Sequence, residues 1–407
     1  MHTERLIARR ILFADRKERR ISRPVIRIAT TAIALGCAVM TIAISVVAGF
    51  KQEIKSKLIG FQGQIQISRF DGNISQESAP FSADSSMLTQ ITAIPGIRHV
   101  QSYATKAGII KHDDDIQGIV LKGVGSDYDW SYFKGNLVAG SIPNFLSSTA
   151  SDEVVLSKSL AEKLRLRIGD RFNTYFIQQP PRARKFKVAG IYSTGFEEFD
   201  KVFVLCNLGQ IRKLNDWSET QSGGIEISLD SDEQMEEVTT KVYESIGSDL
   251  NAQSAHELYP QLFDWLELQD INAVIIIALM LAVSGINMIS ALLVIMLERV
   301  RLIGTLKALG AMDSSIRKVF LWVAARILTR GMLIGTGLGV FLVVLQYFFH
   351  LAPLDESSYY ISYVPVRLMP FEISLVLLGT FCTCLAMMLL PAVLIGKIRP
   401  TAAIKYD

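Results

Sequence analysis

One stretch between two long apolar segments, ERVRLIGTLKALGA at 298–311, combines charged, apolar and small residues in a pattern suited to binding. Arg299, Arg301 and Lys307 outnumber the single acid, Glu298, and such an excess of basic residues places a loop on the cytoplasmic side of a membrane. Apolar residues recur here at helical spacing, with small residues between them. The chemistry this pattern offers is recognition: a short amphipathic helix that another protein can bind. A solvated basic connector between two spans is the alternative.

Motifs for bond-making chemistry are missing from the sequence. It contains no Gly-x-x-x-x-Gly-Lys-Ser/Thr phosphate loop, no His-Glu-x-x-His and no Gly-x-Ser-x-Gly. Cys382 and Cys384 lie two apart in an apolar run and the five His are scattered, so no set has metal-site spacing. We therefore expect no catalytic residues, no metal and no cofactor bound by this chain. An unrecognised hydrolase in its polar part is the alternative.

The elements around this stretch are long apolar segments. The chain is 50% hydrophobic and 20% charged with a mean hydropathy of +0.30, a balance typical of membrane spans combined with a soluble part. Apolar runs of more than about 20 residues cross a bilayer as helices. The first run is longer than the core of a signal peptide and continues into a charged helical pattern, so we interpret it as a retained anchor. The four predicted spans are 25–50, 271–297, 319–350 and 373–396.

Charge predicts the orientation of these spans. Residues 1–27 carry nine Lys/Arg against three acids, with apolar residues at helical spacing, which predicts a cytoplasmic amphipathic helix over 1–24 on an anionic membrane surface. We expect 298–318 and the basic tail 397–407 to be cytoplasmic as well. The segments 51–270 and 351–372 then lie outside. These basic residues flank spans, so we expect a membrane and no nucleic acid as their partner.

The large outer segment, 51–270, alternates between short strands and helices. Its pattern predicts an α/β (α+β) domain of two subdomains between the first and second spans, with the second subdomain, about 125–215, inserted into the first. Strands 172–177 and 186–191 flank a loop with two prolines, which cannot donate to a strand ladder, so we expect this loop to project from the sheet. Helical repeats at 50–58 and 258–268 predict two helices that extend the spans outward as a stalk.

Small and polar residues inside the spans predict how the helices pack. Gly331, Gly335 and Gly339 recur every fourth residue, a pattern typical of close helix packing. The faces of the first and second spans offer apolar surface that either meets lipid or forms an entry wall for a lipid-bearing substrate. The candidate wall residues are Met40, Ile44, Val47, Ile286 and Ile289.

The cytoplasmic segment reads Glu-Arg-x-x-x-Ile-Gly-x-Leu-Lys-Ala-Leu-Gly, and with four spans and the outer domain it resembles the FtsX/MacB-type ABC permeases. The resemblance implies that this segment is a coupling helix seated in a groove of a separate, dimeric ATPase subunit that binds the ATP. The contacts it implies are Glu298, Arg301, Ile303, Gly304, Lys307, Ala308 and Gly310.

Further motifs are similar to the lipoprotein-releasing LolC/LolE branch of that superfamily. They are Val-Ala-Gly-Phe at 47–50, Ser-Tyr-Val-Pro-Val at 362–366 and Arg-Pro-Thr-Ala-Ala at 399–403. The proline-rich loop resembles the Hook of that family, which binds a periplasmic carrier chaperone. The Hook residues it implies are Pro180, Pro181, Arg182, Arg184 and Phe186.

This resemblance implies an inner-membrane permease subunit that extracts lipoproteins and passes them to the carrier, driven by the ATPase. A second permease chain, identical or homologous, is implied because four spans enclose little. Two alternatives stay open. One is a MacB- or FtsX-like permease for efflux or for activation of a cell-wall hydrolase, and the other is a membrane sensor that transports nothing.

Overall fold

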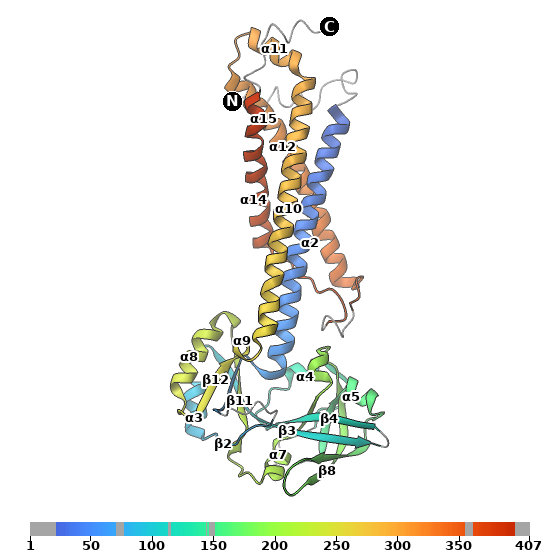
Figure 1. Ribbon diagram of the computed structural model, residues 1–407, viewed down its shortest axis with the longest axis vertical. Coiled ribbons are helices and arrows are strands. Elements are labelled where there is room, and N and C mark those ends of the chain that lie inside the picture. Colours follow the sequence, from blue (N-terminus) through green and yellow to red (C-terminus); the bar gives the residue numbers. More distant parts are fainter. Residues whose placement is uncertain are drawn as a thin grey trace. The chain divides into compact units, whose positions relative to one another are not determined.

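The computed structural model describes residues 22–70, 77–112, 115–143, 145, 151–354 and 361–394, which form two compact units (Figure 1). The membrane unit comprises the described residues of Met1–Lys51, Trp265–Pro353 and Val364–Asp407, and the exported unit those of Gln52–Asp264 and Leu354–Tyr363. Most of the predicted N-terminal helix, residues 1–21, and the tail 397–407 lie outside the described residues. Each unit is described separately.

Long apolar helices make up the membrane unit. Within the described residues four stretches are long and apolar enough to cross a membrane, which confirms the predicted number and order of spans. The third begins earlier than predicted, at Asp313. The helices are α2 (Ser22–Gln62), α10 (Pro260–Glu298), α11 (Val300–Ala308), α12 (Asp313–Phe349), α14 (Pro370–Met387) and α15 (Leu389–Leu394).

A row of glycines brings α12 against α2. Gly331, Gly335 and Gly339 are all buried. A Cβ on Gly335 would lie 2.1 Å from the carbonyl oxygen of Ala34, and one on Gly331 would lie 2.8 Å from Ile33 Cβ. Two helix backbones can approach this closely only where the side chain is a hydrogen atom. The predicted packing role of this row is confirmed.

The connection between α12 and α14 crosses α2. The backbone N–H of Arg367 donates to the carbonyl of Ser45 at 2.9 Å. A Cβ on Gly49 would lie only 2.6 Å from the Cα of Val366, so the connection passes directly over this glycine. Two of the sequence motifs named above, 47–50 and 362–366, therefore meet in the folded chain.

The helices α2 and α10 both continue past the predicted outer ends of their spans, as the stalk prediction requires. The rings of Phe50 and Trp265 lie 5.4 Å apart, edge to face, and Lys51 Nζ lies 2.5 Å from the carboxylate of Asp270. One detail of the prediction is wrong: Leu258 belongs to a separate short helix, α9 (Ala255–Leu258), and α10 begins only at Pro260.

A ten-stranded sheet forms the frame of the exported unit, in the order β12-β1-β11-β3-β4-β9-β6-β8-β5, with β7 pairing with β3 and β8. Its strands are β1 (Ile65–Arg69), β3 (Ile97–His112), β4 (Asp115–Val124), β5 (Leu137–Gly140), β6 (Glu153–Ser157), β7 (Arg171–Phe176), β8 (Arg182–Tyr192), β9 (Phe203–Asn207), β11 (Gly224–Leu229) and β12 (Leu250–Ser254). The short β2 (Phe81–Ser82) and β10 (Gln221–Ser222) pair separately.

Helices cover this sheet and divide its core. They are α3 (Ser85–Thr92), α4 (Ser131–Gly135), α5 (Lys158–Lys163), α6 (Glu197–Asp200), α7 (Leu208–Asn215), η1 (Asp232–Gln234) and α8 (Met235–Ser245). One apolar cluster joins β1, β11 and β12 to α3 and α8, and another joins β4 and β6–β9 to α5 and α7. The 16-residue β3 pairs with β11 through its first half and with β4 through its second.

The alternating runs at 107–110 and 116–120, on either side of an acidic turn, predict a hairpin. It is present as β3 and β4, in register from Tyr103↔Val124 to His112↔Asp115. Both halves of the unit share one continuous ladder. The insertion of 125–215 as a separate subdomain therefore stays a prediction.

Candidate functional site

The coupling segment folds as a short helix with a sharp end. The helix α11 follows α10 after a break at Arg299 and ends at a glycine, Gly310, whose φ of +88° lies in the left-handed region that favours glycine. The N–H of Ala311 donates to Leu306 O at 2.9 Å and that of Gly310 to Lys307 O at 3.0 Å. These two bonds satisfy carbonyls of the last turn and end the helix in a Schellman motif. The chain can then turn directly into α12.

Three of the predicted contact residues hold α11 against the bundle. Ile303 and Gly304 are buried, and Ile303 lies in the same apolar cluster as Ile316 and Phe320 of α12. Lys307 Nζ lies 2.9 Å from Asp313 Oδ1 across the turn. The bundle covers Ile303 and Gly304, so in this arrangement their surface packs against the chain itself. Their contact with an ATPase stays a prediction. Their role is to seat the helix.

The opposite face of α11 is exposed. Two of the predicted contacts on α11, Arg301 and Ala308, are exposed, and so are Glu298 at the end of α10 and Gly310 in the turn after α11. Two large apolar side chains that the prediction missed, Leu309 at 79% exposure and Met312 at 71%, lie in the turn between α11 and α12. Exposed apolar side chains beside a basic residue suit a protein surface better than water. Both lie beyond the end of α11, so helical spacing did not indicate their exposure.

The predicted Hook is shorter than expected. The ladder of β7 and β8 continues to the pair Phe176↔Arg182, so the loop comprises only residues 177–181. Arg182 and Arg184 belong to strand β8, and Phe186 is fully buried in the core. The alternation of β8 points the Phe186 side chain inward, so in this arrangement it packs in the core, and its contact with a carrier stays a prediction.

The same loop is held at its base rather than projecting freely. The guanidinium of Arg182 donates to both carboxylate oxygens of Asp216, at 3.0 and 2.6 Å, and to the carbonyl of Leu214 at 2.8 Å. Gln178 Nε2 donates to the same carbonyl at 3.1 Å. Since Arg182 donates hydrogen bonds to the Asp216 carboxylate, it lowers the pKa of that group. At the tip Pro180 and Pro181 are exposed, and so is Ile177, at 82%.

The candidate entry-wall residues differ in their burial. Met40 is buried inside the bundle, with its sulfur 3.9 Å from Thr380 Oγ1, so it exposes no apolar surface in this arrangement, and its role in a wall stays a prediction. Ile286 is exposed. The other three candidates, Ile44, Val47 and Ile289, are half-buried. Only these four keep apolar surface available.

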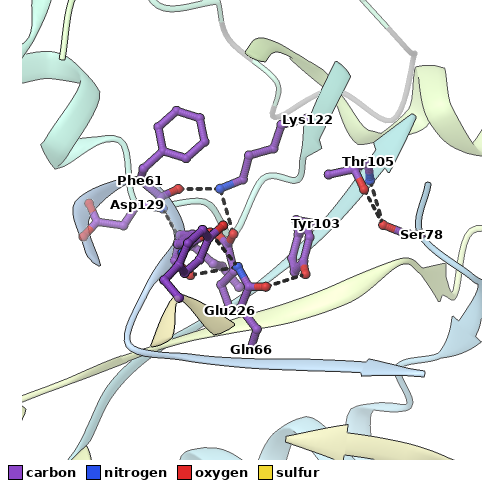
Figure 2. A network of polar contacts seen from close by, with 11 residues as sticks. Phe61, Gln66, Ser78, Tyr103, Thr105, Lys122, Asp129 and Glu226 are labelled. Carbon is purple, nitrogen blue, oxygen red and sulfur yellow. Dashed lines mark hydrogen bonds and ion pairs between the residues drawn. The ribbon is translucent and has the colours of Figure 1, made fainter. Parts of the chain in front are cut away.

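A buried ion pair in the exported unit was missed by the sequence analysis. Lys122 of β4 and Glu226 of β11 are 2% and 1% exposed, and Nζ lies 2.7 Å from Oε1. Figure 2 shows the ammonium between this carboxylate and the carbonyl of Phe61, to which it donates at 2.5 Å. Glu226 Oε2 also accepts from Gln101 Nε2 at 2.9 Å. The signal was a charged residue directly after an apolar run in each of two strands, Lys122 after Ile-Val-Leu in β4 and Glu226 after Gly-Ile in β11.

This ion pair fixes the end of α2. The last four carbonyls of a helix have no partner within it, and Phe61 lies in the last turn of α2. Lys122 satisfies that carbonyl, and the rings of Phe61 and Tyr103 lie 4.8 and 5.7 Å from its Nζ. Burial lowers the pKa of Lys122, and the attraction and hydrogen bond of Glu226 offset part of that shift.

A second buried acid lies at the end of α6. Asp200 accepts from Thr194 Oγ1 at 2.7 Å and from the Thr194 N–H at 3.0 Å. Burial raises the pKa of Asp200, and these hydrogen bonds only partly oppose that effect. The carboxylate closes the turn between β8 and α6.

The described residues contain no cluster of three or more His, Cys, Asp or Glu that could hold a metal ion. The exposed residues around α11 and the loop at 177–181 are the candidate interaction surfaces, and similar proteins indicate what such surfaces bind.

Two family models match the chain. The MacB-like periplasmic core domain matches residues 28–244 and the FtsX-like permease C-terminal region matches residues 274–400. The periplasmic region of MacB from Actinobacillus actinomycetemcomitans overlays with a TM-score of 0.35 at 15% identity, over 51% of this chain and 95% of that chain. That overlay carries no argument about function.

Similar curated proteins extend over nearly the whole chain. The lipoprotein-releasing system transmembrane protein LolC of Xylella fastidiosa is 21% identical, with 92% of each chain covered. LolC of Neisseria meningitidis is 22% identical, with 92% of each covered. The corresponding LolE of Haemophilus influenzae is 20% identical, over 90% of this chain and 91% of the relative. Because the first family model matches more than half of the residues, the chain belongs to the permeases with a MacB-like periplasmic core domain and, by these relatives, to their LolC/LolE type.

Proposed function

We propose that this chain is the permease subunit of an ABC transporter that extracts lipoproteins from the inner membrane and passes them to a soluble periplasmic carrier. The proposal is supported by sequence similarity to LolC over 92% of the chain. It is also supported by an α11 that packs against the bundle on one face and is exposed on the other. A separate ATPase dimer binds the open face and the ATP. The termini and α11 are cytoplasmic, and the exported unit is periplasmic.

The cargo explains why a transporter must shield the lipid. Three acyl chains of about 16 carbons, at ~0.8 kcal/mol per CH₂, would cost on the order of 40 kcal/mol if they were exposed to water. The lipid therefore moves between apolar surfaces. The exposed side of α10, including Ile275, Leu279 and Ile286, supplies one such surface, and a second permease chain, identical or homologous, closes the other side.

In the proposed mechanism the ATPase moves α11, and this movement passes to the exported unit through the stalk helices, α10 and α2. Since α11 is seated by Ile303 in the same apolar cluster as α10 and α12, a push on its open face moves those helices together. The pairs Phe50–Trp265 and Lys51–Asp270 couple α10 to α2. Lys122 then holds the end of α2 within the exported unit, where the loop at 177–181 is the candidate carrier contact.

The test is ATP-dependent release of a triacylated lipoprotein to a soluble carrier by the complex in proteoliposomes. Gly304→Arg should abolish release and copurification of the ATPase, since a buried glycine cannot accept a guanidinium side chain. Arg301→Glu, on the open face, should weaken copurification without unfolding the chain. Lys163→Glu in the exported unit, an equally exposed charge reversal, is the control.

Two results would refute the proposal. Mapping of residues 305 and 180 to the same side of the membrane would remove the mechanism. Release that persists in cells lacking this chain would favour the MacB- or FtsX-like alternatives, to which both family models also apply.

A further inference from the structure

We propose that a groove between α12 and the α14–α15 break binds an anionic phospholipid of the cytoplasmic leaflet. One acyl chain would lie in the groove and the phosphate would lie against Lys318. The assignment to the cytoplasmic leaflet rests on the proposed function, which places α11 on that side.

The groove has a volume of about 500 Å³, within the range of sites that bind small molecules and lipids. Three helices, α12, α14 and α15, supply its walls. Its lining residues are Lys318, Leu321, Trp322 and Ala325 of α12, and Phe381, Leu385, Ala386 and Leu389 of α14 and α15. The α12 residues follow one another at helical spacing, so they form one face of that helix.

A helix break shapes the opposite wall. Pro391 has no N–H to donate to the carbonyl of Met387, and α14 ends at that residue. After the break at Met388, α15 continues for six residues, with Leu389 in the groove. Met388 and Cys384 are fully buried on the other side of the break. The groove is therefore fixed by backbone geometry and by packing, not by the rotamer of one side chain.

The charge at the groove selects the ligand. Among the described residues that line the groove, Lys318 is the only charged one, and it is exposed. Arg317, the preceding residue, adds a cation at the same end of α12, while the nearby acid Asp313 is engaged by Lys307 at 2.9 Å. Trp322 is 40% exposed, as suits an indole at the membrane interface. An apolar groove ending at a cation fits an acyl chain joined to an anionic headgroup.

The experiment uses Trp322 as the reporter. The complex of this chain with its ATPase is placed in phosphatidylcholine nanodiscs that contain equal fractions of brominated phosphatidylglycerol or brominated phosphatidylcholine. Subtracting the fluorescence of Trp322→Phe isolates quenching at the groove. We expect the phosphatidylglycerol probe to quench about fivefold more effectively, the ratio that one lysine contributes at an anionic surface.

Variants separate charge from shape. Lys318→Gln should remove the preference for phosphatidylglycerol, whereas Arg326→Gln, a cation of the same helix outside the lining, should keep it. Ala325→Phe should fill the groove and reduce quenching by both probes. Equal quenching by the two probes in the wild type would overturn the proposal, because the groove would then be ordinary lipid-facing surface.

Absence of quenching by either probe would overturn it as well, because a protein would then cover the groove. Lipoprotein release is measured in the same nanodiscs. Release without a lipid preference refutes only the groove, and a lipid preference without release refutes only the proposed function.

Discussion

Replacing Lys122 by methionine should destabilise the exported unit and loosen the end of α2. The substitution keeps the length and apolar stem of the side chain but removes the ammonium that lies 2.7 Å from Glu226 and 2.5 Å from the Phe61 carbonyl. Glu226 then keeps its charge in a site where it is 1% exposed, while Gln101 still donates a hydrogen bond to it. Breaking a buried pair by removing one partner costs about 3–5 kcal/mol.

For a unit of this size, each kcal/mol corresponds to about 2–4 °C in Tm, so the expected decrease is roughly 6–20 °C. The assay is thermal unfolding of the full chain in detergent, combined with hydrogen exchange of the amides at 59–63. Exchange there should rise more than in α5, which lies in another apolar cluster.

The double variant Lys122→Met/Glu226→Leu separates loss of charge balance from loss of packing. It removes both charges together and should recover at least half of the lost stability, since apolar replacement of a buried pair is often neutral. A single variant that costs less than about 1 kcal/mol would refute the reasoning. So would a double variant no more stable than the single one.

Three further predictions address packing, the loop and pH. Gly335→Leu should lower Tm strongly, because its Cβ would lie 2.1 Å from the α2 backbone. Gly337→Leu, whose Cβ would meet open space, is the control and should leave Tm nearly unchanged. Equal Tm values for the two variants would contradict the packing. Arg182→Ala should raise hydrogen exchange at 177–181, and Asp216→Ala should match it; unchanged exchange would show that the loop is held otherwise. The folded-state pKa of Asp200 is raised, so its contribution to stability is greatest below about pH 3.8 and is lost as pH rises through the raised value. The unfolding free energy of the wild type minus that of Asp200→Asn should therefore be largest at low pH. A difference that increases with pH would contradict this.

Local patterns predicted much of this fold. Span positions followed from apolar run length, and the glycine row at 331–339 predicted a close helix crossing that the structure confirms. The hairpin of β3 and β4 followed from two alternating runs around an acidic turn. The strand β12 was missed because LNAQS has little apolar alternation. Its place in the sheet comes from pairing with β1, about 185 residues away in the chain, and a single sequence does not encode such pairing locally.

The candidate site shows the same division between local and long-range information. Helical spacing predicted α11, but which face is open depends on the bundle that covers Ile303 and Gly304. The Hook pattern matched the family at Phe186, yet strand alternation in β8 turns that side chain into the core. Lys122 and Glu226 meet because their strands, β4 and β11, lie on either side of β3 in the sheet. Their strands are about 100 residues apart, so no sequence spacing indicates the pair.

The crossing of the outer connection over Gly49 limits how α2 can move. A shift of one helical turn, about 5.4 Å along the axis, would replace this glycine beneath Val366 with a residue that carries a side chain. A Cβ on Gly49 would lie only 2.6 Å from the Val366 backbone, and the Arg367 N–H holds the connection to the Ser45 carbonyl. Sliding of α2 along its axis, or rotation about it, would therefore disrupt this contact. Tilting about Gly49 would preserve it, and a sideways displacement at one end of a tilting rod becomes an opposite displacement at the other.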